Sequence, residues 1–412
     1  YGIFFGLFVL GGTFSLALFH LKRELGRDDA TAPAWTVPFD RRYVTVLAGI
    51  SLAIFVTSLG IFFGFPRIGL GYFANQGRSQ TSVAGFSDNV ELGSHGVIRD
   101  NPEVVLRVEF PGGRPKTLDT FHWRTMTFDH YDGSGWSRTL ESRDTPRQLG
   151  KGIYDLNQLH IWKSPESTRR SAPKRLEMYV EPLGSDTLPT MWPVERIEFG
   201  RSWDQAPPDS PRAGGIRTDN LGDVHHTVAS DIGIPYTIHT RPRPDPAVLR
   251  EVDKPVETKD PAVKPFLQVP EDIDPIRQLA QRVTSEAETP YAKAEAVEQF
   301  LQSNYTYTTN LPKMETDNPV QEFLLEARRG HCEYYASAMA LMLRSVDVPT
   351  RMVNGFLGGK WNGVGNYLAV RQGDAHSWVE IYLPDYGWIQ MDPTPPGTPT
   401  QTNAVVEWYR ET

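Results

Sequence analysis

Cysteine is almost absent from this chain of 412 residues, because Cys332 is the only one. A single cysteine excludes an internal disulfide framework and any zinc site built from several thiolates. A lone cysteine is most often an inert, buried side chain, and this is the simplest interpretation of Cys332. The alternative is chemical use, which depends on the groups that lie around the thiol.

An excess of positive charge is also absent. The chain holds 42 Lys and Arg against 50 Asp and Glu, a net charge of -8, which argues against nucleic acid as a principal partner. The 33 prolines and 35 glycines favour many turns and strands over a helical bundle. A chain of this length is sufficient for two or three domains, and no internal repeat is visible.

Long uncharged runs occur only near the N-terminal end, at residues 1–19 and 43–65. A helix needs about 20 apolar residues to cross a bilayer. We therefore expect 1–19 to be the end of a transmembrane helix of a longer protein and 43–65 to be a second such helix; buried core helices are the alternative. The loop at 20–42 carries Lys and Arg near both ends, which predicts a cytoplasmic loop and places the chain after Pro66 outside the cytoplasm.

The region 66–240 is predicted to be a β-rich extracytoplasmic domain that serves as a spacer or contacts a partner. Short runs rich in β-formers predict its strands, at 104–110, 121–128, 174–180, 194–199 and 236–240. The pair His225 and His226 would point to opposite faces of a strand and has no companion cysteine, so a metal site is disfavoured there.

A proline-rich stretch at 241–275 predicts a semi-rigid linker. It is followed by an α+β domain at 276–398, and residues 399–412 would begin a connection to a further segment. Helical periodicity and β-formers predict the elements of this domain: helices at 276–286, 292–303, 320–328 and from Cys332 to about 346, and strands at 305–308, 351–356, 367–371, 377–383 and 387–391.

Cys332 stands where the last of these helical patterns begins. Apolar and small residues recur at three- and four-residue steps after it, which predicts an amphipathic helix with Cys332 in its first turn. At that position the helix dipole favours a thiolate over a thiol.

His376 and Asp392 are its candidate partners. His376 opens one predicted strand, Asp392 closes the next, and a turn at 384–387 joins them. In a hairpin the two side chains would meet across the sheet, as a Cys-His-Asp relay requires. A surface His and a surface Asp at strand ends remain the alternative, and the spacing alone does not decide between them.

Three motifs resemble those of the transglutaminase-like superfamily: residues 330–336 (GHCEYYA), 376–380 (HSWVE) and 387–394 (GWIQMDPT). The resemblance covers about residues 276–396. It implies a papain-like fold with Cys332 as nucleophile, His376 as base and Asp392 as the residue that orients the base.

Residues 85–93 (GFSDNVELG) and 128–133 (FDHYDG) also resemble one branch of that superfamily, the bacterial membrane-embedded proteins of the TgpA type. The resemblance implies a multi-pass protein of the bacterial cytoplasmic membrane, with the bilayer and an envelope protein or peptide as partners. It also implies a further span after Thr412.

The implied activity is acyl transfer: Cys332 forms a thioester from an amide, commonly of a glutamine side chain, and an amine or water resolves it. A cysteine protease or amidase acting on envelope peptides is one alternative, and a non-catalytic envelope-binding scaffold is another. We predict no cofactor and no metal, because no acidic loop like the calcium sites of animal transglutaminases is recognisable. The sequence carries no prediction of the oligomeric state.

The neighbours of these residues have simpler interpretations. His331 is expected to point away from the thiol, and Glu333 complements the helix dipole. Tyr305 and Tyr307 are candidates for a cleft wall or an oxyanion site, and the backbone N–H of Cys332 is the expected oxyanion donor.

Overall fold

The computed structural model describes residues 45, 49, 86, 89–92, 101–118, 120–140, 142–156, 174–182, 184–200, 215–227, 233–252, 254–309 and 318–396. The chain divides into two compact units, Tyr1–Thr81 and Ser82–Thr412. The predicted membrane spans and their loop, 1–65, lie outside the described residues except for Thr45 and Gly49, and so does 399–412. In the part of the chain that is described, no helix is both long and apolar enough to cross a membrane.

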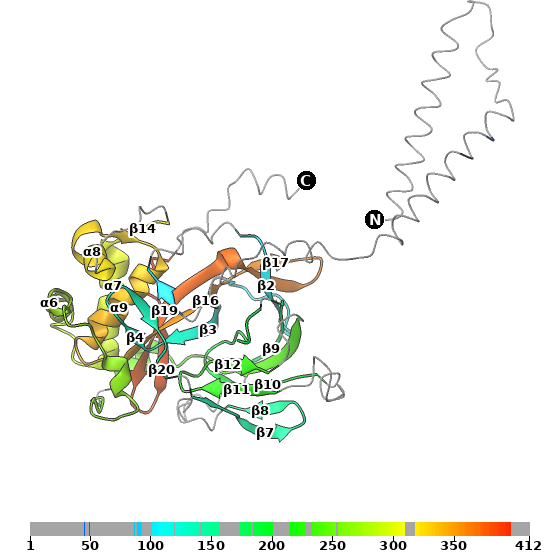
Figure 1. Ribbon diagram of the computed structural model, residues 1–412, viewed down its shortest axis with the longest axis horizontal. Coiled ribbons are helices and arrows are strands. Elements are labelled where there is room, and N and C mark those ends of the chain that lie inside the picture. Colours follow the sequence, from blue (N-terminus) through cyan, green and yellow to red (C-terminus); the bar gives the residue numbers. More distant parts are fainter. Residues whose placement is uncertain are drawn as a thin grey trace, which may run out of the picture. The chain divides into compact units, whose positions relative to one another are not determined.

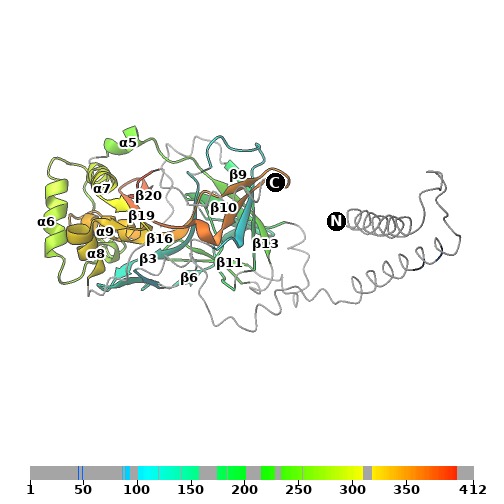
Figure 2. The same ribbon diagram turned by 90° about the horizontal axis from the view of Figure 1, so that it is seen from above.

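In the unit Ser82–Thr412 the longer helices gather at one end and the strands β7 to β13 at the other (Figures 1 and 2). The described helices, including short 3-10 and π segments, are α5 (Pro246–Arg250), η4 (Lys264–Leu267), α6 (Asp274–Val283), α7 (Pro290–Asn304), α8 (Pro319–Glu322), η5 (Phe323–Ala327), α9 (Cys332–Arg344) and η6 (Gln372–Asp374). The predicted helices at 276–286, 292–303 and 320–328 correspond to α6, α7 and the α8–η5 pair. Pro319 stands in the first turn of α8, where its missing N–H costs nothing.

Two antiparallel sheets dominate the described strands. The larger has the order β17-β18-β2-β9-β13-β10-β8-β7 and the smaller has the order β20-β19-β16-β3. The strands of the larger sheet are β17 (Lys360–Asn362), β18 (Tyr367–Arg371), β2 (Val104–Glu109), β9 (Lys174–Val180), β13 (Ile234–Thr240), β10 (Val194–Glu198), β8 (Ile153–Asp155) and β7 (Arg147–Gly150). Those of the smaller are β20 (Gly387–Met391), β19 (Ala375–Leu383), β16 (Thr350–Leu357) and β3 (His122–Phe128).

Three small sheets complete the described strands. They have the orders β1-β5-β4, β12-β11-β6 and β14-β15, and only the last is parallel. Their strands are β1 (Val90–Glu91), β4 (His130–Tyr131), β5 (Gly135–Ser137), β6 (Arg143–Asp144), β11 (Ile216–Asp219), β12 (Val224–His226), β14 (Thr306–Tyr307) and β15 (Arg329–Gly330).

Each of the two large sheets contains strands from both sides of the linker that the sequence predicts at 241–275. β3, from the predicted β-rich domain, pairs with β16, whereas β18, from the predicted catalytic domain, pairs with β2. The predicted linker itself contains α5, η4 and the start of α6, and its Phe266 is buried against Trp388 with ring centroids 4.6 Å apart. The sequence does not indicate these contacts across the predicted boundaries, because strand pairing between distant segments leaves no trace in local pattern.

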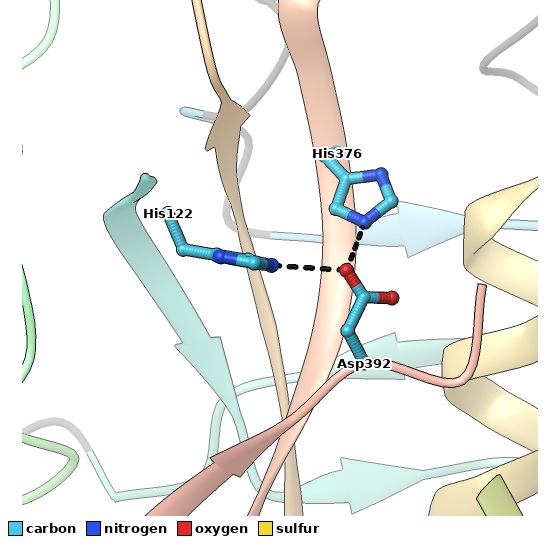
Figure 3. Close-up of side chains that lie close together, drawn as sticks. All are labelled: His122, His376 and Asp392. Carbon is cyan, nitrogen blue, oxygen red and sulfur yellow. Dashed lines mark hydrogen bonds and ion pairs between the residues drawn. The ribbon is translucent and has the colours of Figure 1, made fainter. Parts of the chain in front are cut away.

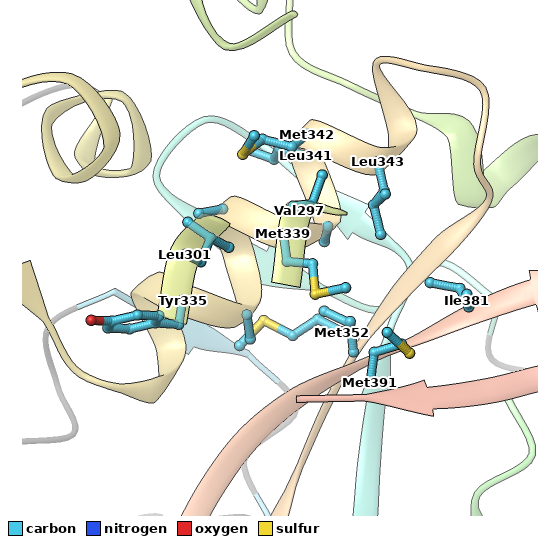
Figure 4. Packing of buried hydrophobic residues seen from close by; sticks show 14 of the residues in the cluster. Val297, Leu301, Tyr335, Met339, Leu341, Met342, Leu343, Met352, Ile381 and Met391 are labelled. Carbon is cyan, nitrogen blue, oxygen red and sulfur yellow. The ribbon is translucent and has the colours of Figure 1, made fainter. Parts of the chain in front are cut away.

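Helix α9 lies at the centre of the helical end. All 13 of its residues are buried, so the predicted amphipathic helix is buried on every face. α6, α7 and α8 contact it, and so do β16 and β19. Figure 4 shows Val297 and Leu301 of α7 and Met352 of β16 packed around α9, in one core cluster. This enclosure fixes the position of the residue that begins the helix.

A buried charge network joins β3 to the neighbouring strands of the small sheet. The Arg124 Nε donates to the Glu380 Oε1 at 3.2 Å, and the Arg351 Nε donates to the Glu380 Oε2 at 2.7 Å. Arg124 also pairs with Asp223 at 2.7 Å. Since removing one member would leave a buried charge with fewer partners, the network holds β3 in register with β16 and β19.

Candidate active site

Cys332 is the first residue of α9, as predicted, and is buried. His331 before it has an extended backbone, with φ of -103° and ψ of -178°, and caps the helix without a side-chain hydrogen bond. Gly330 allows the chain to approach the start of α9 in this conformation. A Cβ at position 330 would lie 2.9 Å from the Phe323 ring and 3.0 Å from the Cβ of Tyr334, which is too close for a larger residue. The thiol thus lies at the positive end of the helix dipole.

His376 and Asp392 belong to one hairpin, as the sequence predicts. β19 and β20 pair antiparallel with Val379 opposite Met391, and Asp392 follows directly. The Nε2 of His376 lies 2.8 Å from the Oδ2 of Asp392. With Nε2 occupied by the carboxylate, Nδ1 is the nitrogen of His376 that remains for another partner.

The pKa of His376 reports on both of its predicted partners. Burial by itself lowers this pKa, but the charge and hydrogen bond of Asp392, together with a hydrogen bond and charge interaction with Cys332, raise it to about 10. Both partners therefore favour the imidazolium form of His376. The structure brings His376 into contact with both Asp392 and Cys332.

Asp392 has a low pKa although its side chain is only partly exposed. Burial raises its pKa, but the charge of His376 and hydrogen bonds from His122 and His376 lower it far more, well below the usual range of an aspartate. Its second oxygen, Oδ1, accepts the backbone N–H of Thr394 at 3.0 Å. The carboxylate is thus bound at both oxygens and remains a fixed negative charge beside His376.

Helix α7 holds the backbone of Asp392 with two side chains one turn apart. The Glu298 Oε1 accepts the N–H of Asp392 at 2.9 Å, and the Gln302 Nε2 donates to its carbonyl at 2.9 Å. Positions four apart lie on one helix face, so both contacts follow from helical geometry. Burial, with the nearby charges of Asp392 and Glu295, raises the pKa of Glu298 to about 7.

The sequence missed three residues around Asp392: His122, Glu298 and Gln302. His122 comes from β3, which is 270 residues away from Asp392 in the chain, and its Nε2 lies 2.9 Å from the same Oδ2 that His376 contacts (Figure 3). The strand that carries His122 was predicted, but its pairing was not. The sequence also does not indicate which face of α7 meets Asp392, because polar residues on a helix usually mark the side that faces solvent.

Other candidates from the sequence have structural roles. His225 contacts Asp186 at 3.1 Å and Asp219 at 3.0 Å within a buried network, and His226 contacts the Ser185 carbonyl at 3.0 Å. Carboxylates and a backbone carbonyl therefore serve as hydrogen-bond partners of these two histidines.

The aromatic candidates are also engaged in packing. The hydroxyl of Tyr305 donates to the carbonyl of Leu324 at 2.8 Å, so it is not placed as an oxyanion donor. His331, which we expected to point away from the thiol, is buried with its ring edge-on to Tyr334.

One group in the described residues has ligand atoms close enough for a metal ion: those of His122, His376 and Asp392 lie within 4.8 Å of one another. Each ring nitrogen is within hydrogen-bond distance of one carboxylate oxygen. Hydrogen bonds therefore account for the convergence of these three side chains.

The fold and the site define a class, that of the transglutaminase-like proteins. The family model described as the transglutaminase-like superfamily matches residues 277–393, which include Cys332, His376 and Asp392. A second model, the TgpA N-terminal domain, matches residues 1–241. That match covers more than half of the chain, and the chain belongs to the TgpA family of transglutaminase-like proteins.

Relatives and solved structures agree with this assignment. The chain is 28% identical over 353 residues to a protein-glutamine gamma-glutamyltransferase of Pseudomonas aeruginosa, with 84% of this chain and 46% of the relative covered. It is 29% identical over 291 residues to the uncharacterized protein YebA of Bacillus subtilis, with 66% and 37% covered. The crystal structure of the periplasmic domain of TgpA from Pseudomonas aeruginosa, bound to ethylmercury, matches with a TM-score of 0.58 at 25% identity, covering 75% of this chain and 96% of that one. The chain spans less than half the length of the two curated relatives.

Proposed function

We propose that this chain is part of a membrane-anchored, extracytoplasmic cysteine acyltransferase of the bacterial envelope, with Cys332, His376 and Asp392 as its catalytic triad. The observation that carries the proposal is the ordered set of contacts from the Cys332 thiol through His376 to Asp392. The name of the Pseudomonas aeruginosa relative, a protein-glutamine gamma-glutamyltransferase, supports a glutamine side chain as the acyl donor.

In the first step the Cys332 thiolate attacks the carbonyl carbon of the glutamine side-chain amide and forms a C–S bond. His376 gives its proton to the amide nitrogen, the C–N bond breaks and ammonia leaves, so a thioester remains. We propose the backbone N–H of Cys332 as one donor to the developing oxyanion, because N–H groups in the first turn of a helix do not donate to a carbonyl of the same helix.

In the second step a primary amine attacks the thioester carbon and the C–S bond breaks. His376 takes a proton from the amine, Cys332 returns to the thiolate and the product is an isopeptide bond. Water in place of the amine converts the glutamine to glutamate. Asp392 keeps the imidazole oriented and stabilises its positive charge in both steps.

The experiment is amine incorporation by the full chain in detergent. It is incubated with a glutamine-containing peptide and a labelled primary amine, and wild type is compared with Cys332→Ala and with Cys332→Ser, which nearly keeps the shape of the side chain. Incorporation that is present in wild type and lost in both variants supports the transferase. A stable thioester adduct on Cys332, detected by mass spectrometry when the amine is withheld, supports the first step.

The alternatives give different products. Deamidation or peptide cleavage without amine incorporation contradicts the transferase and identifies an amidase or protease. A folded wild-type protein that yields none of these products with a panel of peptides, and no adduct on Cys332, contradicts both enzymatic functions and leaves the envelope-binding scaffold.

A further inference from the structure

His122 contributes a second histidine to the carboxylate of the site. His122 and His376 both direct Nε2 at the Oδ2 of Asp392, at 2.9 Å and 2.8 Å (Figure 3). We propose that His122 is a positioning residue of the acyl-transfer reaction, which holds Asp392 by a neutral hydrogen bond so that its charge stays aligned with His376. This inference rests on the proposed function, because it assigns His122 a role in the proposed triad.

The sheet brings His122 to this place through an irregularity at Gly355. The pairing of β3 with β16 shifts register between Asn354 and Gly355, and Gly355 lies opposite His376 on β19. A Cβ at position 355 would lie 2.0 Å from the carbonyl oxygen of Trp123 and 2.7 Å from the Trp378 ring. Only glycine allows β3 and Trp378 to approach β16 this closely.

Packing on Trp378 then fixes the imidazole rings of both histidines. The His122 ring meets the Trp378 ring edge-on, with centroids 5.0 Å apart and planes at 77°. The His376 ring lies nearly parallel to the same indole, at 6.3 Å and 20°. The two histidines are buried, so neither ring can turn without displacing its neighbours.

The hydrogen bonds indicate which form of His122 is present. Its Nδ1 is 3.3 Å from the carbonyl of Thr120 and its Nε2 is 2.9 Å from Asp392, so both ring nitrogens face acceptors. A neutral imidazole has one N–H, and the shorter contact to a charged acceptor is the stronger one. His122 therefore donates from Nε2 to Asp392. Burial, together with the charges of Arg243 and His376, lowers the pKa of His122 and favours this neutral form, although Asp392 acts in the opposite direction.

A neutral donor has a specific advantage at this point. Thr394 binds Oδ1, and His122 and His376 bind Oδ2, so the plane of the carboxylate is fixed. Because His122 brings no positive charge, the negative charge of Asp392 remains available to the His376 imidazolium. Without His122, Oδ2 keeps one of these two donors and the carboxylate can turn about its Cβ–Cγ bond.

The test compares two substitutions in the full chain. His122→Phe keeps a planar ring against Trp378 but removes the donor, whereas His122→Gln keeps an N–H donor. His239→Phe, on β13 of the larger sheet, is the matched control for exchanging a histidine for phenylalanine. The first readout is amine incorporation, resolved into kcat and KM for the glutamine peptide. The second is the rate of Cys332 alkylation by iodoacetamide against pH, which needs no substrate and reports on a single thiol because the chain has only one cysteine.

We expect His122→Phe to lower kcat by about 10- to 100-fold, the effect of losing a hydrogen bond to a charged group, with KM unchanged. The alkylation profile should move to higher pH, because a poorly held Asp392 stabilises the thiolate–imidazolium pair less. His122→Gln should restore most of kcat and of the alkylation profile, and His239→Phe should behave as wild type.

If both variants fold, two outcomes of the activity and alkylation assays would overturn the proposal. One is wild-type kcat and alkylation in His122→Phe. The other is a folded His122→Gln that is as impaired as His122→Phe, which would make His122 a packing residue only. If His122→Phe does not fold, a wild-type profile in His122→Gln supports the hydrogen bond and an impaired one contradicts it. If wild type incorporates no amine, the proposed function fails, but the alkylation profiles still decide whether His122 acts on the triad. A zinc titration with a matching inhibition of wild type alone would identify the three ligand atoms as a metal site instead and would also contradict the proposal.

Discussion

Replacing Glu298 by glutamine should remove a pH-dependent loss of stability. The Oε1 of Glu298 accepts the backbone N–H of Asp392 at 2.9 Å, and a glutamine keeps this acceptor while it removes the charge. Burial and the charges of Asp392 and Glu295 raise the pKa of Glu298 from its ordinary 4.5 to about 7, against the opposing effects of the Asp392 N–H and Arg243. The perturbation is therefore electrostatic, with the hydrogen bond conserved.

The sign follows from proton binding. Between about pH 4.5 and 7 the folded state holds the proton of Glu298 and the unfolded state does not, so stability is greatest below this window and falls as the pH rises through it. At 1.36 kcal/mol per pH unit the whole window amounts to about 3 kcal/mol, of which about 2.5 kcal/mol falls between pH 5 and 8. Relative to wild type, Glu298→Gln should gain stability by about that amount between these two pH values.

The assay is urea unfolding followed by tryptophan fluorescence, for both proteins at pH 5 and pH 8. Asp374, whose pKa burial raises to about 6, titrates in the same window, so the difference between the two proteins is the informative quantity. Glu286→Gln is the control for exchanging a glutamate for glutamine, because Glu286 is exposed and is not among the charges that shift the pKa of Glu298. A Glu298→Gln stability that follows wild type at both pH values would refute the reasoning.

Three further predictions concern the site and the strands that position it. Asp392→Asn should lower kcat on the order of 10²- to 10⁴-fold and should also lower the pKa of His376 from about 10. The His376 imidazolium that assists alkylation of the single cysteine should therefore lose its proton at a lower pH than in wild type. An unchanged pH profile of the alkylation rate would contradict the ion pair. Gly355→Ala should destabilise the fold by about 1–3 kcal/mol in urea unfolding, since its Cβ would lie 2.0 Å from a backbone oxygen. Gly363→Ala is the control and should cost less than about 1 kcal/mol, because a Cβ there meets nothing within 4 Å. Equal effects of the two substitutions would be evidence against the close approach of β3. Glu380→Ala should cost about 3–5 kcal/mol, because it removes the carboxylate that pairs with buried Arg351 and one of the two that pair with buried Arg124; a loss below 1 kcal/mol would show that the network does not hold β3.

The sequence by itself determined the local chemistry of this protein. The helix that starts at Cys332 and the hairpin that carries His376 and Asp392 could be predicted because their signals are local: a periodicity, a turn and two strands that follow one another. Adjacent strands joined by a short turn have few alternatives to pairing with each other. The same local motifs carried the family resemblance, which the match over residues 277–393 confirmed.

The tertiary structure alone decided what surrounds Asp392. His122 arrives from 270 residues away, on a strand whose place in the small sheet depends on β16 and on the missing side chain of Gly355. Glu298 and Gln302 meet the Asp392 backbone only because α7 packs beside the hairpin. Register between distant strands and the face on which a helix packs are set by the total burial of the chain and not by any short segment, so no local pattern could reveal these three residues.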